Sequence, residues 1–200
     1  MQRNTCNVLA RSLLASGVLL LTGTSGWSAD KVKSETIEAT AFGTGTQLGQ
    51  TIGITLNIYE YSTPAEKLML VEAFDKGQNQ GLINALSKMK AVGHLEITGT
   101  IGYDCSFIKV TPTPTGRKIR FVTNRPMNAH EALWDSPSQQ FNLMGGEFDL
   151  NETDKSKSTG VLYPAAQLVI DKEKQLQLDL NQNAWKLVDV IDWKGTPGVN

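Results

Sequence analysis

Hydrophobic and polar residues alternate along much of the chain, which is the pattern of β-strands that bury one face. The alternation is clearest over residues 51–61, where Ile52, Ile54, Leu56 and Ile58 occupy every second position. Weaker alternation predicts further strands, which brings the expected total to about eight. These strands are expected at residues 33–42, 94–107, 117–124, 141–150, 161–170, 176–180 and 185–190.

The period changes to that of a helix after residue 62. Residues 63–66 read Thr-Pro-Ala-Glu, a capping box with proline at the first helical position, so a helix is predicted to begin there and to end at Gly77. A second helix is predicted over residues 80–90, with Gly93 as its left-handed stop. The two helices would form a hairpin whose apolar stripes pack on the sheet. The stripes consist of Leu68, Val71 and Phe74 in the first helix and Leu82, Ala85, Leu86 and Met89 in the second.

Short connections between the later strands favour antiparallel pairing. We therefore predict an α+β fold: a curved antiparallel sheet or partly closed β-barrel of about eight strands, with the helical hairpin inserted between the second and third strands. A two-sheet β-sandwich is the alternative. Pro164 falls inside a predicted strand, which indicates an edge strand or a bulge. Gly99 and Gly102 indicate a bend or bulge nearby, and alternation places one set of residues on a common face: Ile101, Tyr103, Cys105 and Phe107.

The first 29 residues have the organisation of a secretory signal peptide. Arg3 and Arg11 precede an apolar run over residues 13–21, small residues follow, and no acidic residue occurs before Asp30. A membrane span needs about 20 apolar residues, so this run of nine is too short to be a transmembrane anchor. We expect no anchor to remain once the signal peptide has been cleaved. We expect export to the periplasm or the extracellular space. Cleavage is expected after Ser28 or Ala29, followed by a single domain over residues 30–192 and a flexible tail over residues 193–200.

Charge argues against nucleic acid and anionic membranes as partners, and cysteine content argues against an internal disulfide. The whole chain has 19 basic and 20 acidic residues, and removal of residues 1–29 leaves 171 residues with a net charge of −3. A mildly acidic protein lacks the basic surface that binds nucleic acid or an anionic membrane. Cys105 is then the sole cysteine, so no internal disulfide is expected, and its apolar neighbours predict a buried structural residue.

Residue types that support catalysis or metal binding are sparse. The two histidines, His94 and His130, are far apart in sequence and form no zinc-binding pattern with the cysteine, and no cofactor-binding motif occurs. We therefore predict neither a metal nor a cofactor. His94 follows Gly93 at a predicted helix C-terminus, where a positive charge is favourable. Asp104 lies in mid-strand between apolar neighbours, and if it faces inward it needs a basic partner. The candidates for that partner are Arg117, Arg120 and Arg125.

An irregular segment after the strand at residues 117–124 is the better candidate for binding. Residues 128–131 form a second possible capping box, which would open one or two helical turns. The residues that we expect to bind a ligand are Arg125, His130 and Trp134 in this segment, together with Asp104. A separate possibility is the strand at residues 176–180, which has leucine at every second position and could serve as an interface if it lies at a sheet edge.

Several motifs occur in a fixed order along the chain. They are Tyr59–Glu66, the helical stretch 82–89 before Val92-Gly93, Ile101-Gly102-Tyr103-Asp104, and Val122-Thr123-Asn124-Arg125-Pro126. Over most of the mature chain, this order resembles a family of small exported bacterial proteins with no assigned function. This chain has Asn124 where that family has an aspartate, so any role that requires a charge there does not carry over. The resemblance implies an exported domain and supplies no catalytic residues.

These observations favour a non-enzymatic domain that binds a protein partner or a small apolar ligand. Catalytic constellations are absent from the sequence, whereas a curved antiparallel sheet can enclose a pocket. The alternative is a secreted hydrolase-like enzyme that uses Asp104 with a nearby arginine or histidine.

Overall fold

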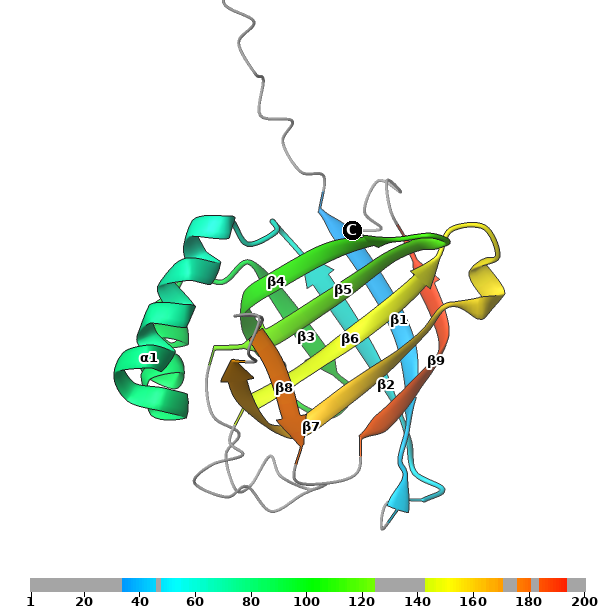
Figure 1. Cartoon of the computed structure of the whole chain (residues 1–200). Helices are drawn as coiled ribbons and strands as arrows, with labels where there is room; N and C mark the ends of the chain where they lie inside the picture. Colours follow the sequence, from blue (N-terminus) through cyan, green and yellow to red (C-terminus); the bar gives the residue numbers. More distant parts are fainter. Residues whose placement is uncertain (1–33, 46–47, 125–142, 171–175, 181–183, 194–200) are drawn as a thin grey trace, which may run out of the picture. The chain divides into compact units, whose positions relative to one another are not determined.

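Nine antiparallel strands and one α-helix make up the part of the chain that the computed structural model describes, which is residues 34–45, 48–124, 143–170, 176–180 and 184–193 (Figure 1). All of these residues belong to one compact unit, Val32–Asn200. The strands are β1 (Glu35–Phe42), β2 (Thr51–Ile58), β3 (Gly93–Ile97), β4 (Tyr103–Thr113), β5 (Gly116–Thr123), β6 (Leu143–Asn151), β7 (Thr159–Ile170), β8 (Leu176–Leu180) and β9 (Trp185–Asp192). The helix is α1 (Pro64–Leu86).

Eight of the described strands close into a barrel. Neighbouring strands pair antiparallel in the order β6-β5-β4-β3-β2-β1-β9-β7, and β6 also pairs with β7, which joins the two ends. β8 lies outside this circuit and pairs with β7 from Ala166 to Ile170. The prediction of a β-rich barrel is confirmed. The circuit is complete rather than partial, so the alternative of a two-sheet sandwich is not the arrangement found.

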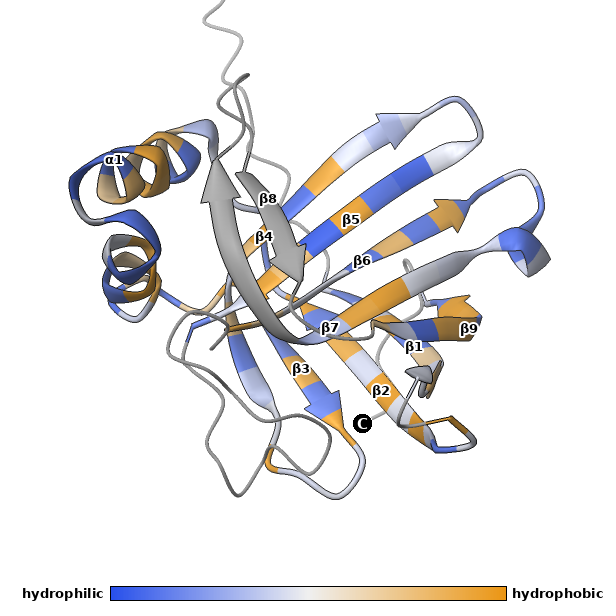
Figure 2. Ribbon diagram, turned by 60° about the horizontal axis from the view of Figure 1, so that its bottom comes forward, coloured by the Kyte–Doolittle hydropathy of each residue, from blue (hydrophilic) through white to orange (hydrophobic). Residues whose placement is uncertain are grey.

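The barrel interior is filled with hydrophobic side chains. Alternate residues point inward, which gives the alternating bands of hydropathy along the strands in Figure 2. Phe121, Phe148 and Trp185 are among the largest fully buried side chains, and the rings of the two phenylalanines stack with their centroids 6.0 Å apart. Burial of one such side chain stabilises the fold by roughly 1.5–3 kcal/mol. The same cluster contains Ile37, Ile54, Leu56, Ile58, Leu95, Tyr103, Ile108, Ile119, Leu162 and Leu187.

A bulge at Ser106 changes which face the later residues of β4 occupy. Cys105 is opposite Thr123 of β5, whereas Phe107 is opposite the adjacent Val122, so β4 has one extra residue between the two pairs. Cys105 therefore belongs to the interior cluster, and Phe107 belongs to a second cluster outside the barrel. The prediction that these two residues share a face is wrong, because one extra residue reverses the alternation. Ile101 is also misplaced by that prediction, since it precedes β4 and is 83% exposed.

Helix α1 packs on the outer surface of the barrel. The bulge residue Ser106 is fully buried, and its hydroxyl donates a hydrogen bond of 2.9 Å to the carbonyl oxygen of Leu86, at the end of α1. The last carbonyls of a helix have no partner within the helix, so this contact satisfies one of them. The bulge and the helix end are thus coupled. The cluster between helix and barrel consists of Leu70, Leu82, Ile83 and Leu86 with Phe107, Val122 and Leu143.

The predicted start and interruption of the helical region are found. Thr63 is the N-cap of a complete capping box, and Gly77 and Gln78 have non-helical backbone angles, with φ 49° at Gln78, which kink α1 where an end was predicted. The second stretch ends at Leu86, earlier than residue 90. Leu68 is 64% exposed, so its predicted place in the buried stripe is wrong.

Two glycines are required by close packing. A Cβ atom at position 93 would lie 2.5 Å from both the carbonyl oxygen of Asn57 and the Cδ1 atom of Ile108. Gly93 is the first residue of β3, so the prediction that it ends a helix is wrong. A Cβ atom at position 146 would lie 2.5 Å from the ring of Phe121. β6 is one continuous strand across Gly145 and Gly146, and the missing side chain at position 146 leaves room for the ring of Phe121.

Pro164 lies where β7 changes partners. β7 pairs with β9 at Gly160–Leu162 and with β8 from Ala166 onward. Its register with β6 shifts between these two regions, because Leu143 is opposite Ala166 and Gly145 is opposite Tyr163. Proline lacks the amide hydrogen that a regular ladder uses, so the prediction of a bulged strand around Pro164 is confirmed.

In the described part of the chain, no helix has the combination of length and apolar character that a membrane span requires. The predicted signal peptide at residues 1–29 lies outside the described residues, as do residues 194–200 of the predicted tail. Both stay predictions.

The capping box provides a test of how much local sequence stabilises α1. The hydroxyl of Thr63 accepts a hydrogen bond of 3.2 Å from the amide of Glu66, whose carboxylate accepts one of 2.6 Å from the amide of Thr63. We expect Thr63→Ala to lower the free energy of unfolding by about 1 kcal/mol in urea denaturation. Thr63→Ser keeps the hydroxyl and should stay close to wild type. Equal loss in both variants would show that the cap contributes nothing.

Candidate functional site

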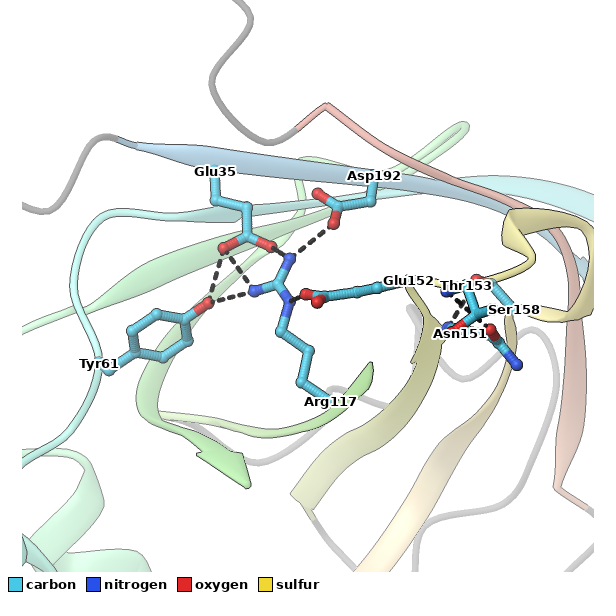
Figure 3. Close-up of polar contacts among 8 residues, drawn as sticks. All are labelled: Glu35, Tyr61, Arg117, Asn151, Glu152, Thr153, Ser158 and Asp192. Atoms are coloured by element: carbon cyan, nitrogen blue, oxygen red, sulfur yellow. Dashed lines mark hydrogen bonds and ion pairs between the residues drawn. The ribbon is translucent and has the colours of Figure 1, made fainter. Parts of the chain in front are cut away.

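A buried arginine lies at one end of the barrel interior (Figure 3). The guanidinium of Arg117 donates to both carboxylate oxygens of Glu35, with one bond at 3.0 Å, and to Asp192 at 2.6 Å. It also donates to the hydroxyl of Tyr61 at 3.1 Å, and that hydroxyl donates to Glu35 at 2.6 Å. The carboxylate of Glu152 lies 3.3 Å from the Nε atom of Arg117. Three acidic side chains therefore surround one cation.

The environment of this cluster raises the pKa values of Arg117 and Tyr61. Burial alone would lower the pKa of Arg117, but the hydrogen bonds and charge of Glu35, together with Asp192, raise it overall. Burial and the contact with Glu35 raise the pKa of Tyr61 far above its ordinary value. Arg117 therefore stays charged and Tyr61 stays neutral across the physiological range. Groups that do not change protonation near neutral pH are poor general acids or bases, so we interpret Arg117 and Tyr61 as structural groups at the barrel end.

Asp104 lies on the outer wall of the barrel, where it contacts a histidine. β3 and β4 pair so that His94 is directly opposite Asp104, and the Nδ1 atom of the ring lies 2.8 Å from the Oδ1 atom of the carboxylate. The predicted place of His94 at a helix C-terminus is wrong, because His94 lies within β3. Neither Arg117 nor Arg120 is the partner of Asp104, since they pair with Glu35 and Glu147.

The pair is one end of a polar row across four strands. Thr36, Asn57, His94 and Asp104 are directly opposite one another from β1 to β4. The hydroxyl of Thr36 donates to the side-chain oxygen of Asn57 at 2.9 Å, and the amide of Asn57 donates to Glu96 at 2.8 Å. These contacts fix the side chains of β2 and β3 on the outer surface of the barrel.

A groove of about 470 Å³ adjoins His94. A Cβ atom at position 102 would lie 2.4 Å from the Nε2 atom of His94, so only glycine leaves room for the ring in this position, and the φ of 76° at Gly102 also favours glycine. Among the described residues, neither lysine nor arginine lines the groove. Its lining consists of Gly53, Thr55, His94, Glu96, Ile97, Thr98, Gly99, Thr100, Ile101 and Gly102.

The remaining predicted site residues divide into two groups. Arg125, His130 and Trp134 lie outside the described residues, so their proximity to Asp104 stays a prediction. Cys105 is buried, as predicted, and burial raises the pKa of its thiol strongly, which keeps it protonated and unreactive. Within the described residues, no three His, Cys, Asp or Glu side chains are arranged to hold a metal ion.

Sequence reasoning found Asp104 and missed its partner. The two residues are ten positions apart, and nothing local marks them as neighbours. Only the register of β3 against β4 brings them together. The signal that could have found the pair is the two glycines between them, Gly99 and Gly102, which shape the turn that sets this register.

The buried cluster predicts a large difference between two arginines of β5. We expect Arg117→Ala to lower the free energy of unfolding by about 3–5 kcal/mol, because it leaves the buried carboxylate of Glu35 without its cation. Arg120→Ala is the matched control, since the side chain of Arg120 is 43% exposed and its pair with Glu147 should contribute less than about 1 kcal/mol. Urea denaturation measures both. Similar losses in the two variants would contradict a structural role for Arg117.

Comparison with known proteins gives no further guide to this site. No protein-family model matches the chain, and no curated protein or solved structure is significantly similar to it. A barrel fold by itself does not specify an activity. Function must therefore be argued from the groove, the polar row beside it and the buried cluster at the barrel end.

Proposed function

We propose that this protein is an exported, non-enzymatic binding domain that recognises a partner through the groove on its outer wall. The observation that carries the proposal is the groove beside His94, where polar side chains fixed by cross-strand contacts converge. The barrel interior offers no support for a small apolar ligand there, because large aromatic and aliphatic side chains pack in it. Export is supported by the composition of residues 1–29.

The lining of the groove indicates the chemistry of the partner. Glu96 lines it and Asp104 adjoins it through His94, whereas no lysine or arginine among the described residues lines it. Ile101, at 83% exposed, adds an apolar surface that a partner can cover. Carboxylates beside an exposed aliphatic side chain suit a cationic group on an apolar stem. We therefore propose a segment of a protein partner that presents lysine or arginine.

Binding can be tested by nuclear magnetic resonance with two matched peptides. We expect a peptide of alternating lysine and leucine to shift the amide signals of residues 94–102, and a peptide of glutamate and leucine to leave them unchanged. Glu96→Gln keeps a side-chain acceptor for Asn57 but removes the charge, and should weaken binding about threefold, which is the scale of an exposed ion pair.

Glu72→Gln is the control, because Glu72 is an exposed carboxylate on α1, away from the groove residues. Equal response to both peptides would contradict the proposed charge selectivity. Shifts of interior residues such as Leu56 on addition of decanoate would instead favour a small apolar ligand.

A second candidate function follows from the contact between Asp104 and His94. A carboxylate at 2.8 Å from Nδ1 orients the imidazole, and its Nε2 atom lies on the side of Gly102, which lines the groove. That arrangement suits a general base in a hydrolase-like enzyme. Two of the threonine hydroxyls in the groove lining, those of Thr98 and Thr100, donate to the carbonyl oxygens of Gly53 and Ile97. We therefore propose water as the nucleophile.

Hydrolysis of 4-nitrophenyl acetate distinguishes the two functions. If the pair is a general base, His94→Gln should lower the rate by at least about 100-fold, and Asp104→Asn should lower it by a smaller factor. Lys90→Gln, on the exposed pair with Glu60, is a control for general surface effects. A wild-type rate no higher than that of the His94 variant would exclude the enzymatic function. It would not affect the proposed binding function.

A further inference from the structure

The two halves of α1 fold back on each other and meet at two small residues. The chain reverses at Gly77 and Gln78, where the backbone angles are non-helical, and the two halves lie side by side in Figure 2. A Cβ atom at position 81 would overlap the carbonyl oxygen of Ala73, so the halves approach this closely only because residue 81 is glycine. This glycine therefore makes α1 a compact helical hairpin.

A groove of about 450 Å³ lies between the two halves of this hairpin. Each half contributes residues three or four positions apart, which form one stripe along a helix. A neighbouring stripe, with Leu70 in the first half and Leu82 and Leu86 in the second, packs on the barrel. The hairpin thus has a second apolar side. The apolar lining residues are Met69, Ala73, Ala85 and Met89, and the charged ones are Lys76 and Lys88.

The charge along the groove has a single sign. Among the described residues, no aspartate or glutamate lines it. Lys76 lies 3.6 Å from Glu72, but the two side chains are 79% and 71% exposed, so this pair contributes little. No ion pair of Lys88 occurs within the described part of the chain. The two lysines are therefore available to an anionic partner.

The lysines lie toward opposite ends of the groove. Ala73 and Gly81 are at the same level of the hairpin, because they touch. Lys76 lies between that level and the kink at Gly77, whereas Lys88 follows the end of α1 and lies on the other side of that level. A partner that fills the groove would therefore meet an apolar surface in the middle and a positive charge near each end.

We propose that this groove binds an amphipathic helix of a partner protein, with aliphatic side chains toward the methionines and acidic side chains near its ends. The groove between two packed helices accepts the ridge of side chains on a third helix. Methionine adapts its shape to irregular apolar surfaces. Carboxylates near the ends of the bound helix would be opposite the two lysines, which favours an acidic partner over a basic one.

This inference is independent of the groove beside His94. That groove belongs to β2, β3 and the turn after β3, and its carboxylate suits a cationic partner. The groove on α1 carries the opposite charge. Failure of the basic peptide to shift residues 94–102 would therefore leave the present inference unaffected.

Nuclear magnetic resonance with two helical peptides tests the proposed occupant. The acidic peptide has about 15 residues, with leucine at every third or fourth position and glutamate near both ends, and the control peptide has lysine in place of glutamate. We expect the acidic peptide to shift the amide signals of residues 69–76 and 81–89. The dissociation constant of the basic peptide should be about tenfold higher, because two attractive contacts become repulsive.

Two matched pairs of substitutions locate the site. Met69→Gln should raise the dissociation constant of the acidic peptide about fivefold by removing apolar contact. Leu68→Gln should leave it unchanged, because Leu68 is 64% exposed and does not line the groove. Lys88→Gln should raise the constant about threefold. Lys90→Gln is its control, since Lys90 pairs with Glu60 and does not line the groove.

Four outcomes would overturn the proposal. The first is an acidic peptide that causes no shifts in residues 69–89 at about 1 mM. The second is an equal effect of the two substitutions within either pair. The third is a shift of these residues by decanoate but not by the peptide, which would indicate an anionic amphiphile as the occupant. The fourth is a shift with protein concentration alone, which would indicate a second copy of the chain.

Discussion

The closed barrel depends on one buried cation. Arg117 of β5 contacts Glu35 of β1 and Asp192 of β9, and β5 is separated from β1 by three intervening strands. These side chains can meet only when the sheet has curved fully and the strand ends face each other across the interior. A buried ion pair adds little net stability compared with apolar packing, but the loss of either member is costly. We infer that the cluster selects the closed arrangement over partly open ones.

The bulge at Ser106 then determines what each part of β4 does. Before the bulge, Asp104 is on the outer wall and Cys105 is in the core. After it, Phe107 is outside and packs against α1, while Ile108 is inside. A single extra residue thus lets one strand present a polar pair at one place and a helix-docking surface at the next. The hydroxyl of Ser106 donates a hydrogen bond to the last turn of α1, so the bulge of β4 and the end of the helix are directly connected.

Local patterns in the sequence were sufficient to predict the strands and the helix. They were insufficient to predict which side chains of different elements contact each other. The capping box at Thr63 and the break at Gly77 depend on neighbouring residues, so they could be predicted. The contact between Arg117 and Glu35 joins residues 82 positions apart, and the one between His94 and Asp104 requires the strand register. No glycine or proline lies within β4 at Ser106 to mark the position of the bulge, which is why alternation placed Phe107 wrongly.

The packed interior leaves the outside of the barrel as the surface on which we propose recognition. One end is occupied by the ion-pair cluster of Arg117, and the interior is filled with aromatic and aliphatic side chains. The outer wall is where polar side chains can both be held in register and reach a partner. The groove on this wall belongs to β2, β3 and the turn after β3.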